Sequence, residues 1–349
     1  MKNNPFCLDF GAEPGLFIPR LAEHNKIIQT FESDTPSSHI FILTGVRGSG
    51  KTVLMTTVSH QLRDNGWMHV DLNPESDMLS QLASGILKKS KNGFPKMKFA
   101  VSVKGVSVSV ESDEKYRNVQ TDLDSMMETL KKHRIRLLIT LDEAGNTKNI
   151  REFTNYFQHC IREEYPVFII MTGLYKNIRA LQNNRTQTFL RRAPRIDLGA
   201  LNLTRISMKY AEVFGCDQRI SDNLARMTCG YSYGFQILGY LMFEAGAKDA
   251  DESILSNYKL NLEECSYDKI WEELSVAERK VMSAIASLKS NIAVKDVRES
   301  LNMDSNMFST YRDVLVKSGV LSSDSAYGRL EFALPFFAEY VLRKGEIYE

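Results

Sequence analysis

The 349-residue sequence has only five cysteines and six histidines, and neither type is arranged as a metal site requires. Zinc ligands usually come as closely spaced cysteine pairs or as two histidines four residues apart on a helix. Here each cysteine stands alone, and no two histidines have that spacing. We therefore predict reduced thiols, no disulfide framework and no structural metal. The cysteines are Cys7, Cys160, Cys216, Cys229 and Cys265.

Long apolar runs and a strong net charge are also missing. No run approaches the roughly 18 apolar residues that span a bilayer. The opening residues, MKNNPFCLDFGAEPGLF, lack a charged segment followed by an apolar one. A net charge of +1 gives no global attraction to nucleic acid or to an anionic membrane, so such a partner would need a local patch. We expect a cytoplasmic protein with no membrane partner.

The remaining composition is typical of a folded globular chain, and length divided by about 150 gives roughly two domains. Through residues 1–203, strand-like apolar runs alternate with helical periodicity, which predicts an α/β fold with a mainly parallel sheet covered on both faces. The predicted strands are 40–44, 67–73, 135–143, 166–173 and 195–201. The predicted helices between them are 53–65, 78–89, 121–134 and 150–165.

An insertion interrupts this alternation. Apolar and polar residues alternate strictly in FAVSVKGVSVSVES, which predicts an inserted β-hairpin at about 98–112. The preceding stretch, Lys88 to Lys104, holds six lysines and no acidic residue. A solvated loop and a nucleic-acid contact both remain open for it.

From Thr204 the pattern is helical only, with Gly215 and Gly230 as expected helix stops. We predict a core at 1–203, a helical lid at 204–265 and a winged-helix domain at 266–349. The last of these rests on three helical segments followed by an apolar ribbon in GRLEFALPFFAEYVL.

The octet GVRGSGKT carries the strongest chemical signal. It fits G-x-x-x-x-G-K-[ST] between an apolar strand and a helix, the context in which backbone N–H groups cradle phosphates. We predict that Lys51 holds the β- and γ-phosphates of ATP and that Thr52 ligates Mg²⁺. The predicted nucleotide-binding residues here are Gly45, Val46, Arg47, Gly48, Ser49, Gly50, Lys51, Thr52 and Val53.

Carboxylates for the metal and the water follow the strand LLITL. Asp142 fits the Mg²⁺ side, and Glu143 fits a general base that polarises the attacking water. Thr172 ends a later strand, where it either senses the γ-phosphate and orients water or satisfies its own turn. An ATPase is therefore the predicted enzyme.

Two arginines, Arg191 and Arg192, precede the fifth predicted strand. An arginine in this place can act in trans on the nucleotide of a neighbouring subunit. A plain surface role is the alternative, and the sequence leaves both open.

In this order, these motifs resemble AAA+ ATPases, with the closest likeness to the initiator (origin-recognition) branch and to STAND-type ATPases. The resemblance implies a P-loop NTPase (AAA+-like) fold. The segment NPFCLDFGAEPGLFIPRLAEHNKI is similar to the family's N-terminal motif, which implies that Ile18, Arg20 and Glu23 lie near the adenine or anchor the lid. Arg20 is thus a nucleotide-binding candidate.

Two departures limit the resemblance. Pro19 stands where the family usually has glycine, and the lid segment CGYSYGFQILGY contains no arginine for a second sensor. That segment looks more like the STAND G-x-P lid, with Ser232 in place of the proline. Lid closure on a nucleotide would need other contacts.

The first functional hypothesis is an ATPase that acts on double-stranded DNA through its winged helix. The recognition helix would be SNMFSTYRDVLVKSG with Arg312 and Lys317, and Arg329 would lie on the wing. Residues 267–349, however, hold 11 Lys/Arg and 13 Asp/Glu, a net charge of −2. DNA-binding modules are usually basic, because phosphate neutralisation supplies much of their affinity.

The second hypothesis is a signalling or defence switch, in which the winged helix binds a separate effector protein or locks the ATPase. The third hypothesis is a helper ATPase for a transposition or defence complex, which would use the same chemistry and differ only in what it binds. We expect slow or partner-stimulated hydrolysis and a nucleotide-dependent homo-oligomer, with DNA and protein partners both open.

Overall fold

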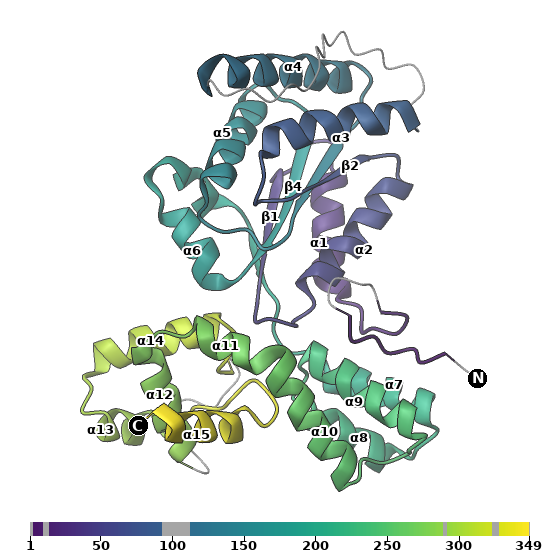
Figure 1. The fold of residues 1–349 in the computed structure, drawn as a ribbon. Coiled ribbons are helices and arrows are strands. Elements are labelled where there is room, and N and C mark those ends of the chain that lie inside the picture. The colour runs from purple at the N-terminus through teal and green to yellow at the C-terminus, as the bar shows by residue number, and fades with distance from the viewer. Residues whose placement is uncertain (1–2, 10–13, 93–111, 289–291, 323–327, 349) are drawn as a thin grey trace. The chain divides into compact units, whose positions relative to one another are not determined.

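The computed structural model describes residues 3–9, 14–92, 112–288, 292–322 and 328–348 (Figure 1). The chain divides into two compact units. The sheet unit comprises Leu21–Thr44 and Leu54–Ile196, and the helical unit comprises Met1–Arg20, Gly45–Val53 and Asp197–Glu349. Residues 98–111 of the predicted hairpin insertion lie outside the described residues, as do residues 93–104 of the lysine-rich stretch.

The sheet has five strands in the order β2-β3-β4-β1-β5. The pairs β2–β3, β3–β4 and β4–β1 are parallel, so these strands end at one edge of the sheet. This confirms the predicted parallel sheet, and every residue of β1 and β3 is buried. The bounds are Ile40–Thr44 (β1), Met68–Leu72 (β2), Leu137–Leu141 (β3), Val167–Gly173 (β4) and Arg195–Asp197 (β5).

Both faces of the sheet are covered (Figure 1). One face packs its branched side chains, such as Ile42 and Ile139, against helices α3 to α6. On the other face the ring of Phe31 of α1 packs at a tilt against the rings of Phe41 and Phe168. The helices are α1 (Leu21–Glu32), α2 (Lys51–Asp64), α3 (Met78–Asn92), α4 (Ser112–Lys132), α5 (Lys148–Arg162) and α6 (Tyr175–Asn183), followed by the 3₁₀ helix η1 (Arg185–Arg192).

The helical unit has its own hydrophobic core, and its first helix ends as expected: Gly215 adopts a left-handed φ of 58° and caps it. The next helix ends before Gly230, at Met227, so the expected stop at Gly230 is displaced. The elements are α7 (Leu203–Phe214), α8 (Gln218–Met227), α9 (Ser232–Ala245), α10 (Glu252–Leu262), the π-helix η2 (Glu263–Tyr267), α11 (Asp268–Glu273), α12 (Val276–Ser287), α13 (Val294–Ser300), α14 (Ser305–Lys317) and α15 (Phe337–Tyr348).

The predicted C-terminal ribbon is wrong in its second half. Antiparallel bridges join Ala293 to Arg329 and Leu321 to Phe332, but the chain then forms α15. Phe336 has a φ of 56°, which ends the extended segment. Phe337, Tyr340 and Val341 are buried at helical spacing, so their apolar run reflects one face of a helix. Three helices and two bridges agree with a winged helix, which stays a prediction.

One close contact in the sheet unit can be tested by mutation. A Cβ on Gly85 of α3 would lie 2.7 Å from Val70 Cγ1 of β2, so Gly85→Ala should lower stability by about 1 kcal/mol through overpacking, despite the better helix propensity of alanine. The urea midpoint, followed by circular dichroism, measures this. Ser84→Ala at the exposed neighbouring position should leave the midpoint unchanged or slightly raised. Equal gains in both variants would contradict the close helix–sheet contact.

Candidate functional site

In the loop Gly45–Gly50, each backbone carbonyl of residues 45 to 49 accepts a hydrogen bond. Lys51 Nζ donates to the carbonyls of Gly45 and Val46, at 3.0 and 2.9 Å. The remaining three carbonyls accept from Tyr231 Oη (2.7 Å, to Arg47), Tyr233 N (3.0 Å, to Gly48) and Arg20 Nη2 (3.0 Å, to Ser49). In loops of this kind the backbone N–H groups bind phosphate. Here the N–H of Ser49 also bonds within the loop, to Val46 O at 3.2 Å.

Glycine is needed at two positions of the loop. Gly48 and Gly50 have φ values of 69° and 89°, a conformation that residues with a Cβ rarely adopt. A Cβ on Gly48 would also lie 2.4 Å from Tyr231 Oη and 2.7 Å from Tyr233 Cβ. The loop is therefore tight both in its backbone and against the start of α9.

The loop fits a phosphate group on two further observations. Helix α2 begins at Lys51, directly after the loop, so its N-terminal end and partial positive charge lie there. Ser49 is 3% exposed, and its Oγ has no hydrogen-bond partner among the described residues. A buried hydroxyl without a partner costs free energy, and a phosphate oxygen would supply the missing partner.

The sheet unit brings Asp142, Glu143 and Thr172 together at the carboxyl ends of β3 and β4. Thr172 Oγ1 donates to the Asp142 carboxylate. Glu143 N donates to Asp142 Oδ1 at 3.1 Å and to Thr172 Oγ1 at 3.2 Å. Glu143 has a φ of 54°, a strained conformation for a residue other than glycine, and its side chain is exposed. Thr172 Oγ1 thus contacts both the Asp142 carboxylate and the backbone N–H of Glu143.

The remaining predicted residues have distinct surroundings. Arg20 also donates to the Gly199 carbonyl at 2.7 Å, so its guanidinium fastens the loop to the segment after β5. Arg191 is tied to the end of α6, donating to Gln182 O at 3.0 Å and to Asn183 Oδ1 at 3.2 Å. Arg192 is exposed at the end of η1. The two neighbouring arginines therefore differ in how far they are already engaged within the chain.

Comparison with known proteins places these features in a family. Residues 36–181 match the family described as AAA domain, and residues 265–341 match a domain of unknown function, DUF8462. Among solved structures, a Walker-type ATPase of Pyrococcus abyssi is similar at a TM-score of 0.65 and 15% identity, over 94% of this chain and 96% of that one. The ORC2 protein of Aeropyrum pernix, solved as ADPNP-ADP complexes, gives 0.59 and 14%, over 98% of both chains. No curated protein sequence matches the chain.

The family match and the fold agree. The chain contains an AAA domain. Its architecture is that of the P-loop ATPases, as the alternation of strands and helices predicted. The loop Gly45–Val53, Asp142, Glu143 and Thr172 all fall within the AAA domain, whereas Arg20, Arg191 and Arg192 lie outside the matched residues.

Two groups of residues near the loop or the strands of the AAA domain were not predicted from the sequence. The first is the pair Tyr231 and Tyr233, whose contacts with the loop join residues far apart in the chain. The second is a polar cluster of His69, Asp71 and Thr140. Its signal was visible in MHVDL, where two polar residues alternate on one face of an otherwise apolar strand.

The polar cluster lies at the carboxyl ends of β2 and β3. His69 Nε2 is 2.9 Å from Thr140 Oγ1 and 3.2 Å from Asp71 Oδ1, and Thr140 donates to Asp71. The hydrogen bond from His69 lowers the pKa of Asp71, and the bond from Thr140 adds to this. Thr140 is two residues before Asp142, which directly follows β3. An ionised Asp71 is therefore fixed beside the strand that carries Asp142.

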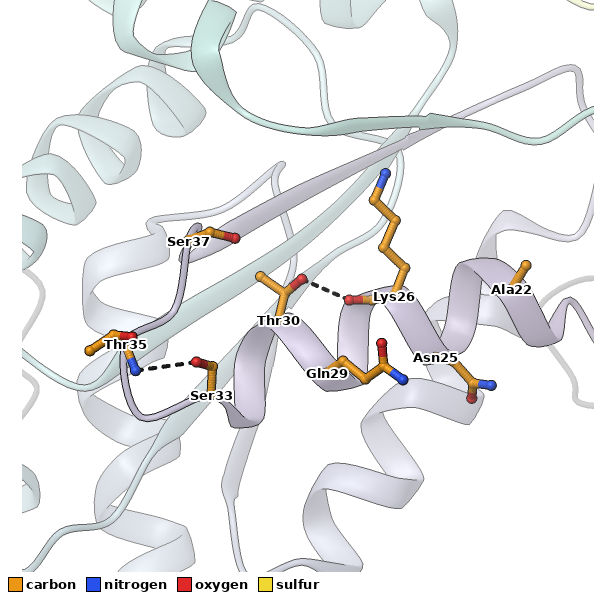
Figure 2. Close-up of a pocket in the computed structure, with 8 residues that line it drawn as sticks. All are labelled: Ala22, Asn25, Lys26, Gln29, Thr30, Ser33, Thr35 and Ser37. Carbon is orange, nitrogen blue, oxygen red and sulfur yellow. Dashed lines mark hydrogen bonds between the residues drawn. The ribbon is translucent and has the colours of Figure 1, made fainter.

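A separate pocket of about 390 Å³ lies along α1, and Figure 2 shows its lining. Its walls are uncharged polar groups with one lysine, and some of these already bond locally: Thr30 Oγ1 donates to Lys26 O and Thr35 N to Ser33 Oγ. None of the predicted site residues lines it. The lining is Ala22, Asn25, Lys26, Gln29, Thr30, Ser33, Thr35 and Ser37.

Neither a membrane-spanning helix nor a metal cluster is found in the described ranges. There, no helix combines the length and the apolar character that crossing a membrane requires. Within the same ranges, no three His, Cys, Asp or Glu side chains are grouped as a metal site. The Asp142 and Thr52 prediction concerns a different kind of site, in which Mg²⁺ also takes phosphate and water ligands.

Proposed function

We propose that the protein binds ATP with Mg²⁺ and hydrolyses it to ADP and phosphate. The observation that carries the proposal is the loop whose three consecutive carbonyls, at residues 47–49, are held by donors from distant segments, directly before the N-terminus of α2. The AAA family match and the likeness to an ORC2 protein solved with nucleotides support it.

Each residue then has a definite task. Lys51 leaves the carbonyls of its own loop to bind the β- and γ-phosphates, because a phosphate is the stronger partner for an ammonium group. Thr52 and Asp142 would hold Mg²⁺, which neutralises the charge that builds on the phosphate oxygens. Glu143 accepts a proton from water as the water oxygen bonds to the γ-phosphorus and the bond to the ADP oxygen breaks. Thr172 keeps Glu143 and Asp142 in place for this step.

For the trans role we propose Arg192 rather than Arg191. Arg191 already donates to Gln182 and Asn183, so a trans role would cost it these two hydrogen bonds. Arg192 is exposed and requires no such exchange. Its guanidinium would stabilise the charge of the transition state on the nucleotide of a neighbouring copy.

The second question is which partner binds the C-terminal module, the matched segment 265–341 with the helices that it contains. One observation favours a protein over DNA. On α14, the candidate recognition helix, the exposed residues are uncharged except for Asp313. Lys317 is paired with that same Asp313 at 2.7 Å, and Arg312 is half-buried. Together with the net charge of −2 over 267–349, this leaves little cationic surface for phosphates. We therefore propose a nucleotide-dependent switch for a protein partner, with DNA binding as the competing function.

Hydrolysis is tested with Glu143→Gln, which keeps the size of the side chain and removes the base. Turnover of ATP should fall about 100-fold or more, since general bases contribute on this scale, while nucleotide affinity stays near wild type. Lys51→Ala should instead lose nucleotide affinity. Phosphate release and equilibrium binding of a fluorescent ATP analogue measure the two effects. Undiminished turnover in Glu143→Gln would remove Glu143 from the mechanism.

The trans role is tested by mixing inactive variants. Arg192→Ala and Glu143→Gln proteins are each expected to be slow alone. A mixture should recover part of the turnover, because one copy supplies the arginine and the other the base. Arg191→Ala serves as the matched control and should stay close to wild type alone. No recovery in the Arg192 mixture would exclude the trans assignment.

The choice between partners is tested by titrating duplex DNA at two salt concentrations, with and without ATP and Mg²⁺. We expect binding to be weak and to lack a steep salt dependence, since few cations are available to displace counterions. Tight binding at low salt that falls steeply with added salt would reverse the choice in favour of DNA.

A further inference from the structure

The Tyr231 hydroxyl bridges the phosphate loop and the C-terminal module. Its Oη donates to the Arg47 carbonyl at 2.7 Å and lies 2.7 Å from Ser266 Oγ. Since the single phenolic hydrogen goes to the carbonyl, the Ser266 hydroxyl donates to Tyr231. Tyr231 is 4% exposed, and burial raises its pKa, so the hydroxyl keeps its hydrogen at every physiological pH.

The bridge meets the loop at its tightest point. Gly48 packs so closely on Tyr231 that a Cβ there would overlap the hydroxyl, and the neighbouring Tyr233 N–H holds the Gly48 carbonyl at 3.0 Å. Two consecutive loop carbonyls thus depend on the first residues of α9. A loop held in this way cannot rotate its peptide groups without breaking these bonds.

Further contacts tie the same stretch to residues 265–341. Arg47 Nε pairs with Glu273 Oε1 of α11 at 2.9 Å. Gly319, after α14, packs against Val46: a Cβ on it would lie 3.2 Å from Val46 N. Ser266 itself is in η2, at the beginning of the matched segment. Three separate parts of the segment therefore contact Val46, Arg47 or the tyrosine that holds Arg47.

We propose that Tyr231 is a positioning residue for the phosphate loop and that its link to Ser266 makes the rate of nucleotide release depend on the C-terminal module. The inference rests on the proposed function, because it concerns the nucleotide held by the same loop. Tyr231 fixes the carbonyl side while the nucleotide occupies the amide side, so each stabilises the other. By linkage, a partner that pulls Ser266 away from Tyr231 weakens nucleotide binding by the same factor by which nucleotide weakens that partner.

The test is the dissociation rate of a fluorescent ADP analogue from the full chain, measured by chase in a stopped-flow instrument. Tyr231→Phe removes only the hydroxyl and should accelerate release about five- to tenfold, the size expected for losing one buried hydrogen bond. Tyr210→Phe is the matched control. It removes a buried hydroxyl from the same core, one that donates to Phe235 O at 2.8 Å and not to the loop, and should release ADP at the wild-type rate.

A second variant separates positioning from stability. Ser266→Ala should accelerate release in the same direction, and the double variant should be no faster than Tyr231→Phe alone, because both changes break one chain of bonds. Additive effects, wild-type release from Tyr231→Phe, or equal acceleration in Tyr210→Phe would each overturn the inference. Failure of the wild-type chain to bind the ADP analogue would overturn the proposed function as well, so the two failures are distinguishable.

Discussion

On the proposed function, the site depends on one constraint: the backbone carbonyls of residues 47–49 must face away from the place where a phosphate is to bind. A peptide group is planar, so fixing a carbonyl also fixes the direction of the N–H beside it. The chain achieves this with donors from distant segments, namely Arg20, Tyr231 and Tyr233. The glycines make the loop conformation possible, but these donors select it from the many conformations that glycines permit.

The same constraint explains why the loop groups with the helical unit although it is covalently joined to β1 and α2. Residues 45–53 follow β1 directly and include the first residues of α2. Their hydrogen bonds, however, go to Arg20 and to the start of α9, which belong to the helical unit. The loop is thus continuous in sequence with strand β1 of the sheet unit, but its conformation is held by hydrogen bonds within the helical unit.

Whether a feature could be predicted from the sequence depends on how far apart along the chain the interacting residues lie. Strands β1, β3 and β4 were predictable because they are buried on both faces and appear as short apolar runs. The edge where Asp142 and Thr172 meet follows from their parallel order. Helix α15 was missed because its apolar face is continuous with an apolar extended segment, and Phe336 with its positive φ leaves no signature in composition.

The contact of Tyr231 with the loop was unpredictable for a different reason. It joins residues 184 apart in sequence, and periodicity describes only neighbours within one element. For the same reason the sequence could not distinguish Arg191 from Arg192. The two are adjacent residues of one type, and only the folded structure shows that Arg191 donates to the end of α6.

The lid segment also changes what the helical unit can sense. The segment CGYSYGFQILGY contains no arginine, so it offers no positive charge to the γ-phosphate. Tyr231 instead donates to a backbone carbonyl of the loop, that of Arg47. A contact with the backbone carbonyl is the same whether two or three phosphates are bound, as long as the loop keeps its shape. On the proposed function, the C-terminal module therefore distinguishes a filled loop from an empty one, and the difference between ATP and ADP is read at Lys51 and at the strand ends that carry Asp142, Glu143 and Thr172.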